Sequence, residues 1–248
     1  MIPSTRAPLA LVSVLLLAAC GRDMQTEKEV TTRTSAGDAA TSISGDSADT
    51  RNQALVRVVN AVPNVIGLTV RSDEAHTLPS VDYKRVSSYQ PIDRNWATFQ
   101  VSGSPNGAYA PIDVNREMLT DGHRYTMVVM RESEGGGFST RIFRDDIASD
   151  STSAHVRVIH AAKGAGELDI VAPGGETIFD DVDYTSEAGF KSMAPWKGAL
   201  QVRDGDGKST LLTLPSLDLM AGGSYTIVIT RDAGGKLASF WFEDRQQA

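Results

Sequence analysis

An internal repeat of about 100 residues constrains the fold of this chain more than any other feature of its sequence. Residues 54–61 read ALVRVVNA and residues 154–161 read AHVRVIHA, with five of the eight positions identical. Further blocks recur in the same order: LTV and LDI, VDY in both copies, FQV and LQV, and finally GHRYTMVVMR and GGSYTIVITR. Two such copies are typical of a pair of discrete domains, because a solenoid needs three or more short repeats. We therefore expect a first repeat over residues 54–146, a polar joint over 147–153 and a second repeat over 154–248.

Within each repeat the pattern predicts short strands. Over residues 225–230, tyrosine and isoleucine alternate with threonine and valine, which is the period of a strand with one face more buried. Turn signals rich in Gly, Pro, Asn and Asp separate the apolar runs, for example at 104–107, 135–137 and 204–207. Only residues 114–119 and 216–220 could each form a turn of helix. About seven strands per repeat predict an all-β chain with two tandem immunoglobulin-like β-sandwiches.

A tyrosine follows a glycine turn at the same point of each repeat. The first copy reads G-H-R-Y up to Tyr125 and the second reads G-G-S-Y up to Tyr225. This arrangement resembles the tyrosine corner of Greek-key sandwiches, in which the hydroxyl bonds to backbone a few residues upstream. A tyrosine that simply opens a strand is the alternative.

The motif set V-R-V-x-[HN]-A, V-D-Y and G-x-x-Y-T-x-V resembles the bacterial domain of unknown function 4397 family, over residues 54–146 and 154–245. The resemblance implies a secreted or cell-envelope protein, and it supplies no catalytic residue because no general activity is established for the family. The first repeat has Asn60 where the family usually has histidine, as at His160, and the second has Lys163 in place of the usual proline.

The amino-terminal segment predicts a signal peptide over residues 1–19. Its uncharged run, residues 7–19, is too short to span a bilayer, which takes about 20 residues, but it fits a signal-peptide core of about 7–15 residues. The run ends in L-A-A-C, which resembles the bacterial lipobox and implies cleavage between Ala19 and Cys20 with a lipid on Cys20. In Gram-negative lipoproteins, aspartate after the cysteine favours retention in the inner membrane. Here Gly21 follows the cysteine, which favours the outer membrane. An ordinary secretory signal is the alternative.

Cys20 is the only cysteine of the chain, so neither a disulfide nor a paired metal thiol is available. Residues 20–53 contain no aromatic residue and few aliphatic ones, which predicts a flexible, disordered tether with ends roughly 30 Å apart, although residues 24–30 could be helical. The net charge of −7 argues against nucleic acid as a partner.

Candidate reactive residues are few. His155 and His160 lie five apart on one predicted strand and so on opposite faces, and Asn60 matches His160, which favours a structural hydrogen bond over catalysis. Asp204 and Asp206 alternate with glycine as in calcium loops, but position 213 holds threonine instead of the expected glutamate, so a hairpin turn is favoured. We expect no metal, no catalytic residue and no cofactor other than the lipid.

Three tryptophans are candidate stacking platforms for sugars. Trp96 and Trp196 recur at the same point of both repeats, which favours core packing. Trp241 lies in F-W-F, where one aromatic side chain must face away from its own core. If that side chain is Trp241, it is exposed or lies between the domains, and it is a weak binding candidate.

These features predict a lipid-anchored envelope lipoprotein with a non-catalytic binding or structural role. Its expected partners are the membrane, through the lipid, and an envelope protein or glycan. One alternative is an envelope hydrolase acting on glycan or peptide, which requires a cleft where a histidine and a carboxylate converge. Another is a subunit of a larger envelope assembly, which requires an exposed apolar patch.

Overall fold

The structure, a computed structural model, describes residues 53–72, 76–93, 96–104, 110–132, 137–145 and 150–244. Every described residue belongs to one compact unit, Thr34–Ala248. The predicted signal peptide, the cleavage site at Ala19, the lipidation of Cys20 and the tether up to residue 52 lie outside the described residues, as does the side chain of His76. The described residues contain no helix with the length and hydropathy needed to cross a membrane.

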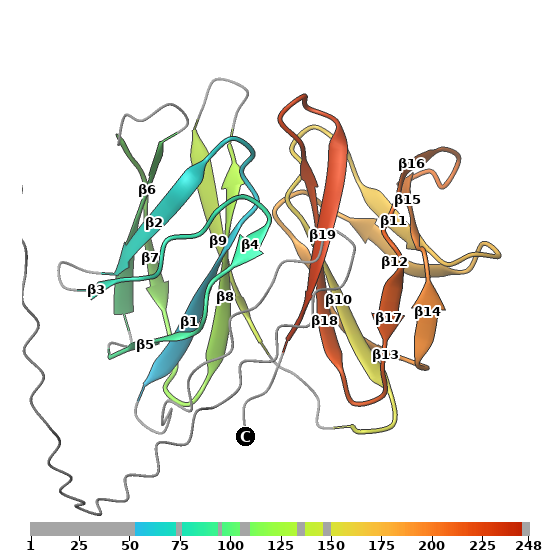
Figure 1. Ribbon diagram of the computed structural model, residues 1–248, viewed down its shortest axis with the longest axis horizontal. Helices are drawn as coiled ribbons and strands as arrows, with labels where there is room; N and C mark the ends of the chain where they lie inside the picture. Colours follow the sequence, from blue (N-terminus) through green and yellow to red (C-terminus); the bar gives the residue numbers. More distant parts are fainter. Residues whose placement is uncertain are drawn as a thin grey trace, which may run out of the picture. The chain divides into compact units, whose positions relative to one another are not determined.

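All regular secondary structure in the described residues is β-strand (Figure 1). The strands of the first repeat are β1 (Ala54–Asn60), β2 (Ile66–Ser72), β3 (His76–Thr77), β4 (Arg85–Val86), β5 (Gln90–Ile92), β6 (Trp96–Ser104), β7 (Ala110–Met118), β8 (Arg124–Arg131) and β9 (Phe138–Arg144). Those of the second are β10 (Ala154–His160), β11 (Leu168–Val171), β12 (Thr177–Val182), β13 (Glu187–Met193), β14 (Trp196–Gly198), β15 (Gln201–Asp204), β16 (Thr210–Thr213), β17 (Leu217–Leu219), β18 (Ser224–Arg231) and β19 (Leu237–Glu243).

Each repeat contains one sheet, here called the inner sheet, that is centred on a parallel pair. Its order is β4-β1-β8-β9 in the first repeat, with β5 also paired to β1, and β13-β10-β18-β19 in the second. The parallel pairs have equivalent registers, because Val56 lies opposite Tyr125 and Val156 opposite Tyr225. The outer sheets are β3-β2-β6-β7 and β12-β11-β15-β16, with β14 and β17 as an additional ribbon in the second repeat. The repeat in sequence is therefore a repeat in strand pairing.

One apolar core lies inside each repeat, between its inner and outer sheets. In the first repeat Val56 and Val58 of β1 share a core with Leu68 of β2 and Phe99 of β6, and the second repeat has the equivalent core. The all-β sandwich prediction is therefore confirmed. Immunoglobulin sandwiches consist of antiparallel sheets, whereas each inner sheet here has a parallel pair at its centre, so the immunoglobulin-like detail is not confirmed.

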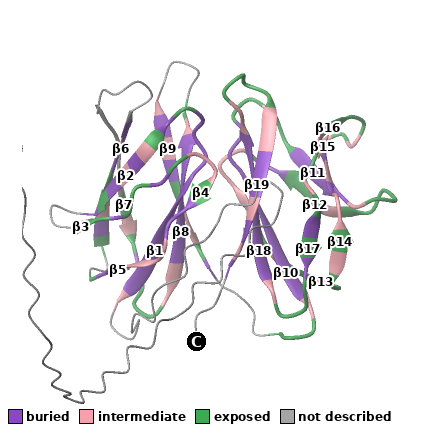
Figure 2. Ribbon diagram, in the orientation of Figure 1, coloured by how far each residue is buried: buried purple, intermediate pink, exposed green. Residues whose placement is uncertain are grey.

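A third apolar cluster joins the two repeats. All residues of β1 and β10 are buried, which requires cover on both faces of each inner sheet (Figure 2). The cluster contains Val59, Ala61, Val86, Val128 and Met130 of the first repeat and Ile159, Ala161, Val228, Phe240 and Phe242 of the second. The second faces of the inner sheets thus pack against each other.

The tyrosine-corner prediction is confirmed, whereas the two predicted helical turns are wrong. The hydroxyl oxygen of Tyr125 accepts the N–H of Thr120 at 2.9 Å, and that of Tyr225 accepts the N–H of Met220 at 3.0 Å. Residues 114–119 and 216–220 instead lie largely in β7 and β17. In β17 the burial alternates along L-D-L, which is the period of a strand, and cross-strand partners in β6 and β14 stabilise the two segments.

The two recurring tryptophans do not have the same environment. Trp196 packs partly buried against the second core, across Gly198, where a Cβ would meet its ring at 2.6 Å. Trp96 is 52% exposed, with the Arg116 guanidinium 5.1 Å from its ring centroid, so the core prediction is wrong for Trp96.

Candidate functional site

The strongest concentration of buried charge lies where the repeats meet. Arg57 and Arg157 stand at the centre of the V-R-V motifs, in the middle of β1 and β10. Because side chains alternate along a strand, the flanking valines enter each repeat's own core and the arginine points to the other repeat. Arg57 is 3% exposed and Arg157 is fully buried.

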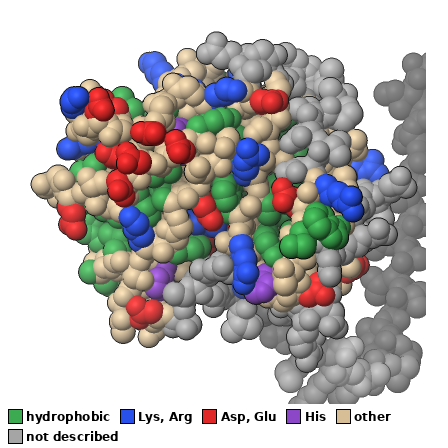
Figure 3. Space-filling model, turned by 180° about the vertical axis from the view of Figure 1, so that it is seen from behind, with side chains coloured by type: hydrophobic (Ala, Val, Ile, Leu, Met, Phe, Trp, Pro, Cys, Tyr) green, Lys and Arg blue, Asp and Glu red, His purple; other side chains and the backbone are tan. Residues whose placement is uncertain are grey.

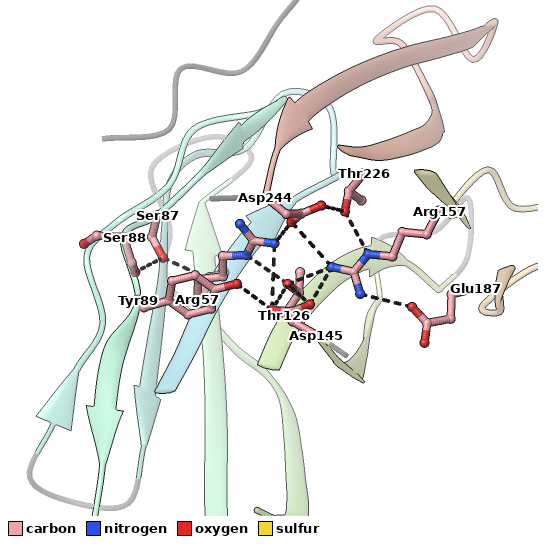
Figure 4. A network of polar contacts seen from close by, with 11 residues as sticks. Arg57, Ser87, Ser88, Tyr89, Thr126, Asp145, Arg157, Glu187, Thr226 and Asp244 are labelled. Atoms are coloured by element: carbon pink, nitrogen blue, oxygen red, sulfur yellow. Dashed lines mark hydrogen bonds and ion pairs between the residues drawn. The ribbon is translucent and has the colours of Figure 1, made fainter. Parts of the chain in front are cut away.

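The two arginines make crossed contacts (Figure 4). Arg57 Nε donates to Thr126 Oγ1 of its own repeat at 2.9 Å, and its Nη2 donates to Asp244 of the second repeat. Arg157 repeats this arrangement, since its Nε donates to Thr226 Oγ1 at 2.8 Å and its Nη2 to Asp145 Oδ1 of the first repeat at 2.5 Å. Each arginine thus pairs with the carboxylate of the other repeat.

The threonines hold the carboxylates in place. Thr126 Oγ1 lies 2.8 Å from both carboxylate oxygens of Asp145, and Thr226 Oγ1 donates to Asp244 Oδ2 at 2.5 Å. Both aspartates directly follow the last strand of their repeat, and their backbone N–H groups continue the inner-sheet ladder to Arg124 and Ser224. Arginine, threonine and aspartate therefore form one connected network across the two inner sheets.

Further side chains complete the network differently in each repeat. Tyr89 of the first repeat donates its hydroxyl to Asp145 Oδ2 at 2.6 Å and lies under the Arg57 guanidinium, 4.7 Å from its carbon to the ring centroid. In the second repeat Glu187 Oε2 accepts from Arg157 Nη1 at 3.2 Å, and the same guanidinium lies 4.7 Å from the ring centroid of Phe190. Both guanidinium planes are thus covered by aromatic rings, which favours the buried cation.

The electrostatics keep this network ionised near neutral pH. Burial alone would raise the pKa of Asp145, but the guanidinium of Arg157, followed by that of Arg57, outweighs it, so the pKa lies below its ordinary value. Burial opposes the charge of Arg157, yet Asp145 and Asp244 raise its pKa above the ordinary value. Burial also raises the pKa of Tyr89 well above its ordinary value, which keeps its hydroxyl a donor.

A second reciprocal contact uses the tyrosines of the two V-D-Y motifs. The Tyr83 hydroxyl donates to the carbonyl of Arg231 at 2.8 Å, and the Tyr184 hydroxyl donates to the carbonyl of Arg131 at 2.6 Å. The residue after each tyrosine, Lys84 or Thr185, has a positive φ of 60° or 67°, which shapes the same turn in both repeats. The motifs shared by the repeats therefore supply contacts between them.

Sequence reasoning missed this network. Nothing near Arg57 in the sequence identifies its partner, a carboxylate almost 190 residues away. The available signal was an arginine at the centre of an apolar strand in both copies, since such a residue is almost never fully buried unless it is paired.

The predicted structural role of His160 is confirmed. Its Nδ1 accepts the N–H of Ala162 at 3.1 Å and its Nε2 lies 2.9 Å from the carbonyl oxygen of Gly166, an arrangement that places the proton on Nε2. Asn60 reproduces both bonds in the first repeat, with Oδ1 accepting from Val62 and Nδ2 donating to Val65. His155 bonds elsewhere, to the carbonyl of Asp150 and the hydroxyl of Ser192.

The Asp204 loop is a hairpin turn between β15 and β16, as the sequence favoured. Asp204 Oδ1 accepts the N–H groups of Lys208 and Ser209 at 2.8 and 3.0 Å, and Asp206 pairs with the Lys208 ammonium on the surface. Among the described residues no group of three His, Cys, Asp or Glu is placed to hold a metal. Ligand binding at Asp204 and Asp206 stays a prediction. Figure 3 shows acidic side chains gathered over the second repeat, at the upper left of the view.

Trp241 is not the aromatic of F-W-F that faces away from its own core. Its ring packs against the core of the second repeat, edge-on to Tyr225 at 6.0 Å between centroids. Its neighbours Phe240 and Phe242 instead face the other repeat, because successive side chains of β19 point to opposite faces. The Trp241 ring is thus partly buried, and binding by Trp241 stays a prediction.

Residues 54–171 match the family described as Domain of unknown function (DUF4397). The match covers the first repeat and the first two strands of the second, so the chain resembles this family as its motifs indicated. No curated protein matches the chain.

Two solved structures show a distant likeness. The C-terminal domain of AlgF from P. aeruginosa is 27% identical, with a TM-score of 0.30, over 38% of this chain and 99% of that one. A protein assigned to cell adhesion from Bacteroides fragilis is 10% identical, with a TM-score of 0.19, over 86% of this chain and 95% of that one. Both TM-scores are too low to support a conclusion about fold or function.

Proposed function

We propose that this protein is a lipid-anchored component of the bacterial cell envelope that presents two β-sandwiches as one paired body, in a non-catalytic binding or structural role. The observation that carries the proposal is the crossed pairing of Arg57 with Asp244 and of Arg157 with Asp145. These buried charges pair with one another and hold the two repeats together. The most deeply buried charged groups are thus engaged in structural contacts, which supports a non-catalytic role.

The envelope location rests on Cys20. It is the only cysteine, it ends an apolar run of signal-peptide length, and the preceding L-A-A completes the lipobox resemblance. An outer-membrane location follows from Gly21 after the cysteine. Two or three acyl groups anchor a protein firmly in a membrane, whereas a single acyl group binds the membrane only weakly.

The anchor is tested by changing the cysteine. We expect Cys20→Ser to move the protein from the membrane fraction to the soluble fraction and to abolish incorporation of labelled fatty acid. Gly21→Asp is the matched control, because it changes the neighbouring residue and leaves the acylated sulfur. Retention of Cys20→Ser in membranes after a high-salt wash would contradict the anchor.

The partner is sought by crosslinking in intact cells. We expect an envelope protein or glycan to be captured through surface residues such as those of the loops, where binding residues concentrate. Comparing wild type with Asp206→Ala and with Trp96→Ala separates the acidic turn from the exposed aromatic as the contact. Turnover of a glycan or peptide by the purified protein would replace this proposal with the hydrolase alternative.

A further inference from the structure

The surface through which the two repeats meet is self-complementary in each repeat. The first repeat brings one cation, Arg57, and one anion, Asp145; the second brings Arg157 and Asp244. Each also brings a tyrosine hydroxyl and the backbone carbonyl that accepts the other repeat's tyrosine. A surface that offers both halves of its ion pairs and of its tyrosine contacts is the kind that forms two-fold symmetric pairs.

We propose that this surface is a homotypic pairing surface and that a second copy of this chain is a partner for it, through the second repeat. When two second repeats face each other in the observed geometry, Arg157 of each chain meets Asp244 of the other. Tyr184 of each then meets the Arg231 carbonyl of the other. The crossed ion pairs and the tyrosine contacts are therefore both kept in such a pair.

The second repeat is the better self-partner because its pairing surface is more apolar. In β19 Phe240 lies opposite Val228 and belongs to the cluster between the repeats. At the equivalent register of β9, Arg141 lies opposite Val128. The first repeat therefore has an exposed arginine where the second repeat has a buried phenylalanine of the cluster between the repeats.

Pairing within one chain normally prevents pairing between chains. The joint of residues 147–153 keeps the two repeats at a high effective concentration, of order millimolar for short linkers. Pairing between chains should therefore be detectable when the joint is cut. It should also be more populated where chains are concentrated, as on a membrane surface.

The test cuts the joint of the folded protein. In the Cys20→Ser chain, residues 147–149 are replaced by a site for a specific protease, the folded protein is cleaved, and native mass spectrometry follows the fragments after dilution and re-equilibration. We expect mixed pairs at first and then pairs of two second repeats, which have their own mass. If only mixed pairs and single fragments appear, the proposal is overturned. This test uses a chain without the lipidated cysteine, so its result does not depend on whether the protein is lipid-anchored.

A charge reversal tests the contact itself. Arg157→Asp leaves only acids at the two ion-pair positions of the second repeat and is expected to lower the yield of second-repeat pairs at least ten-fold. Lys191→Asp is the matched control, since it makes the same charge change at a half-exposed ion pair with Asp180 and should leave the yield unchanged. An unchanged yield with Arg157→Asp would overturn the proposal. Where that variant does not fold, the cleavage experiment on the chain that keeps Arg157 decides the proposal.

Discussion

At the scale of single residues, the stability of this protein depends on matching buried charges. A buried guanidinium is tolerated only when carboxylates and hydroxyls compensate the loss of water, and removing one partner leaves an uncompensated charge. Arg57 and Asp244 meet these conditions from opposite ends of the chain, with Thr226 and Arg157 as additional neighbours of Asp244.

Asp244→Ala should therefore be strongly destabilising. We expect the free energy of unfolding to fall by about 3–5 kcal/mol, because the buried cation of Arg57 loses its nearest carboxylate and keeps only Asp145, at 3.8 Å. Asp218→Ala removes the exposed pair with Lys197 and should cost at most about 1 kcal/mol. Urea denaturation followed by fluorescence measures both variants, and equal effects would show that the crossed pair contributes no more than a surface pair.

At the scale of strands and turns, each repeat closes the end of its first strand with a polar side chain. His160 and Asn60 use different groups to satisfy the same backbone positions. Burial lowers the pKa of His160, because the imidazolium form is disfavoured away from water.

His160→Asn should be tolerated and should change the pH dependence of stability. The neutral ring is the folded form, so its contribution is present above the unfolded pKa of about 6.5 and is lost as the pH falls below that value. We expect wild type to lose stability as the pH falls below about 6.5, and His160→Asn to lose less over the same range. Thermal unfolding across pH gives the comparison, with His160→Ala as the variant that removes both bonds; identical pH profiles for wild type and His160→Asn would exclude this role.

Much of the architecture at this scale could be predicted from sequence. Period-two alternation revealed the strands, and the spacing of Gly and Tyr revealed the tyrosine corners, because both features are local. The parallel pairing of β1 with β8 could not be found in this way, since it depends on residues that are far apart in the chain. Which aromatic of F-W-F faces away from its own core could not be predicted for a related reason, because only the neighbouring repeat determines which face is covered.

At the scale of the whole molecule, the two repeats are joined by an apolar cluster as well as by the polar network. Thr230 of the second repeat also donates its hydroxyl to the carbonyl of Ala61 at 2.6 Å. Unfolding one repeat exposes the pairing surface of the other, so the two should unfold together.

Calorimetry tests this coupling. We expect wild type to unfold in one transition, with the calorimetric and van't Hoff enthalpies in agreement. The double variant Asp145→Ala and Asp244→Ala should separate it into two transitions, because both crossed ion pairs are lost. A matched pair of surface changes, Asp180→Ala with Asp218→Ala, should leave a single transition. Two transitions already in wild type would show that the repeats fold independently.

The crossed ion pairs also restrict how the two copies can diverge after duplication. Asp244 of the other copy lies nearer to Arg57 than Asp145 of its own copy does, so a change at Arg57 is compensated best by a change in the other copy. No such pairing links the outer parts of the two repeats, and there the copies differ. Trp96 is exposed whereas Trp196 is packed, and the second repeat has an acidic turn where the first has an uncharged segment. Selection for new specificity is therefore expected to act on the outer sheets, and sequence covariation should link position 57 to 244 more strongly than to 145.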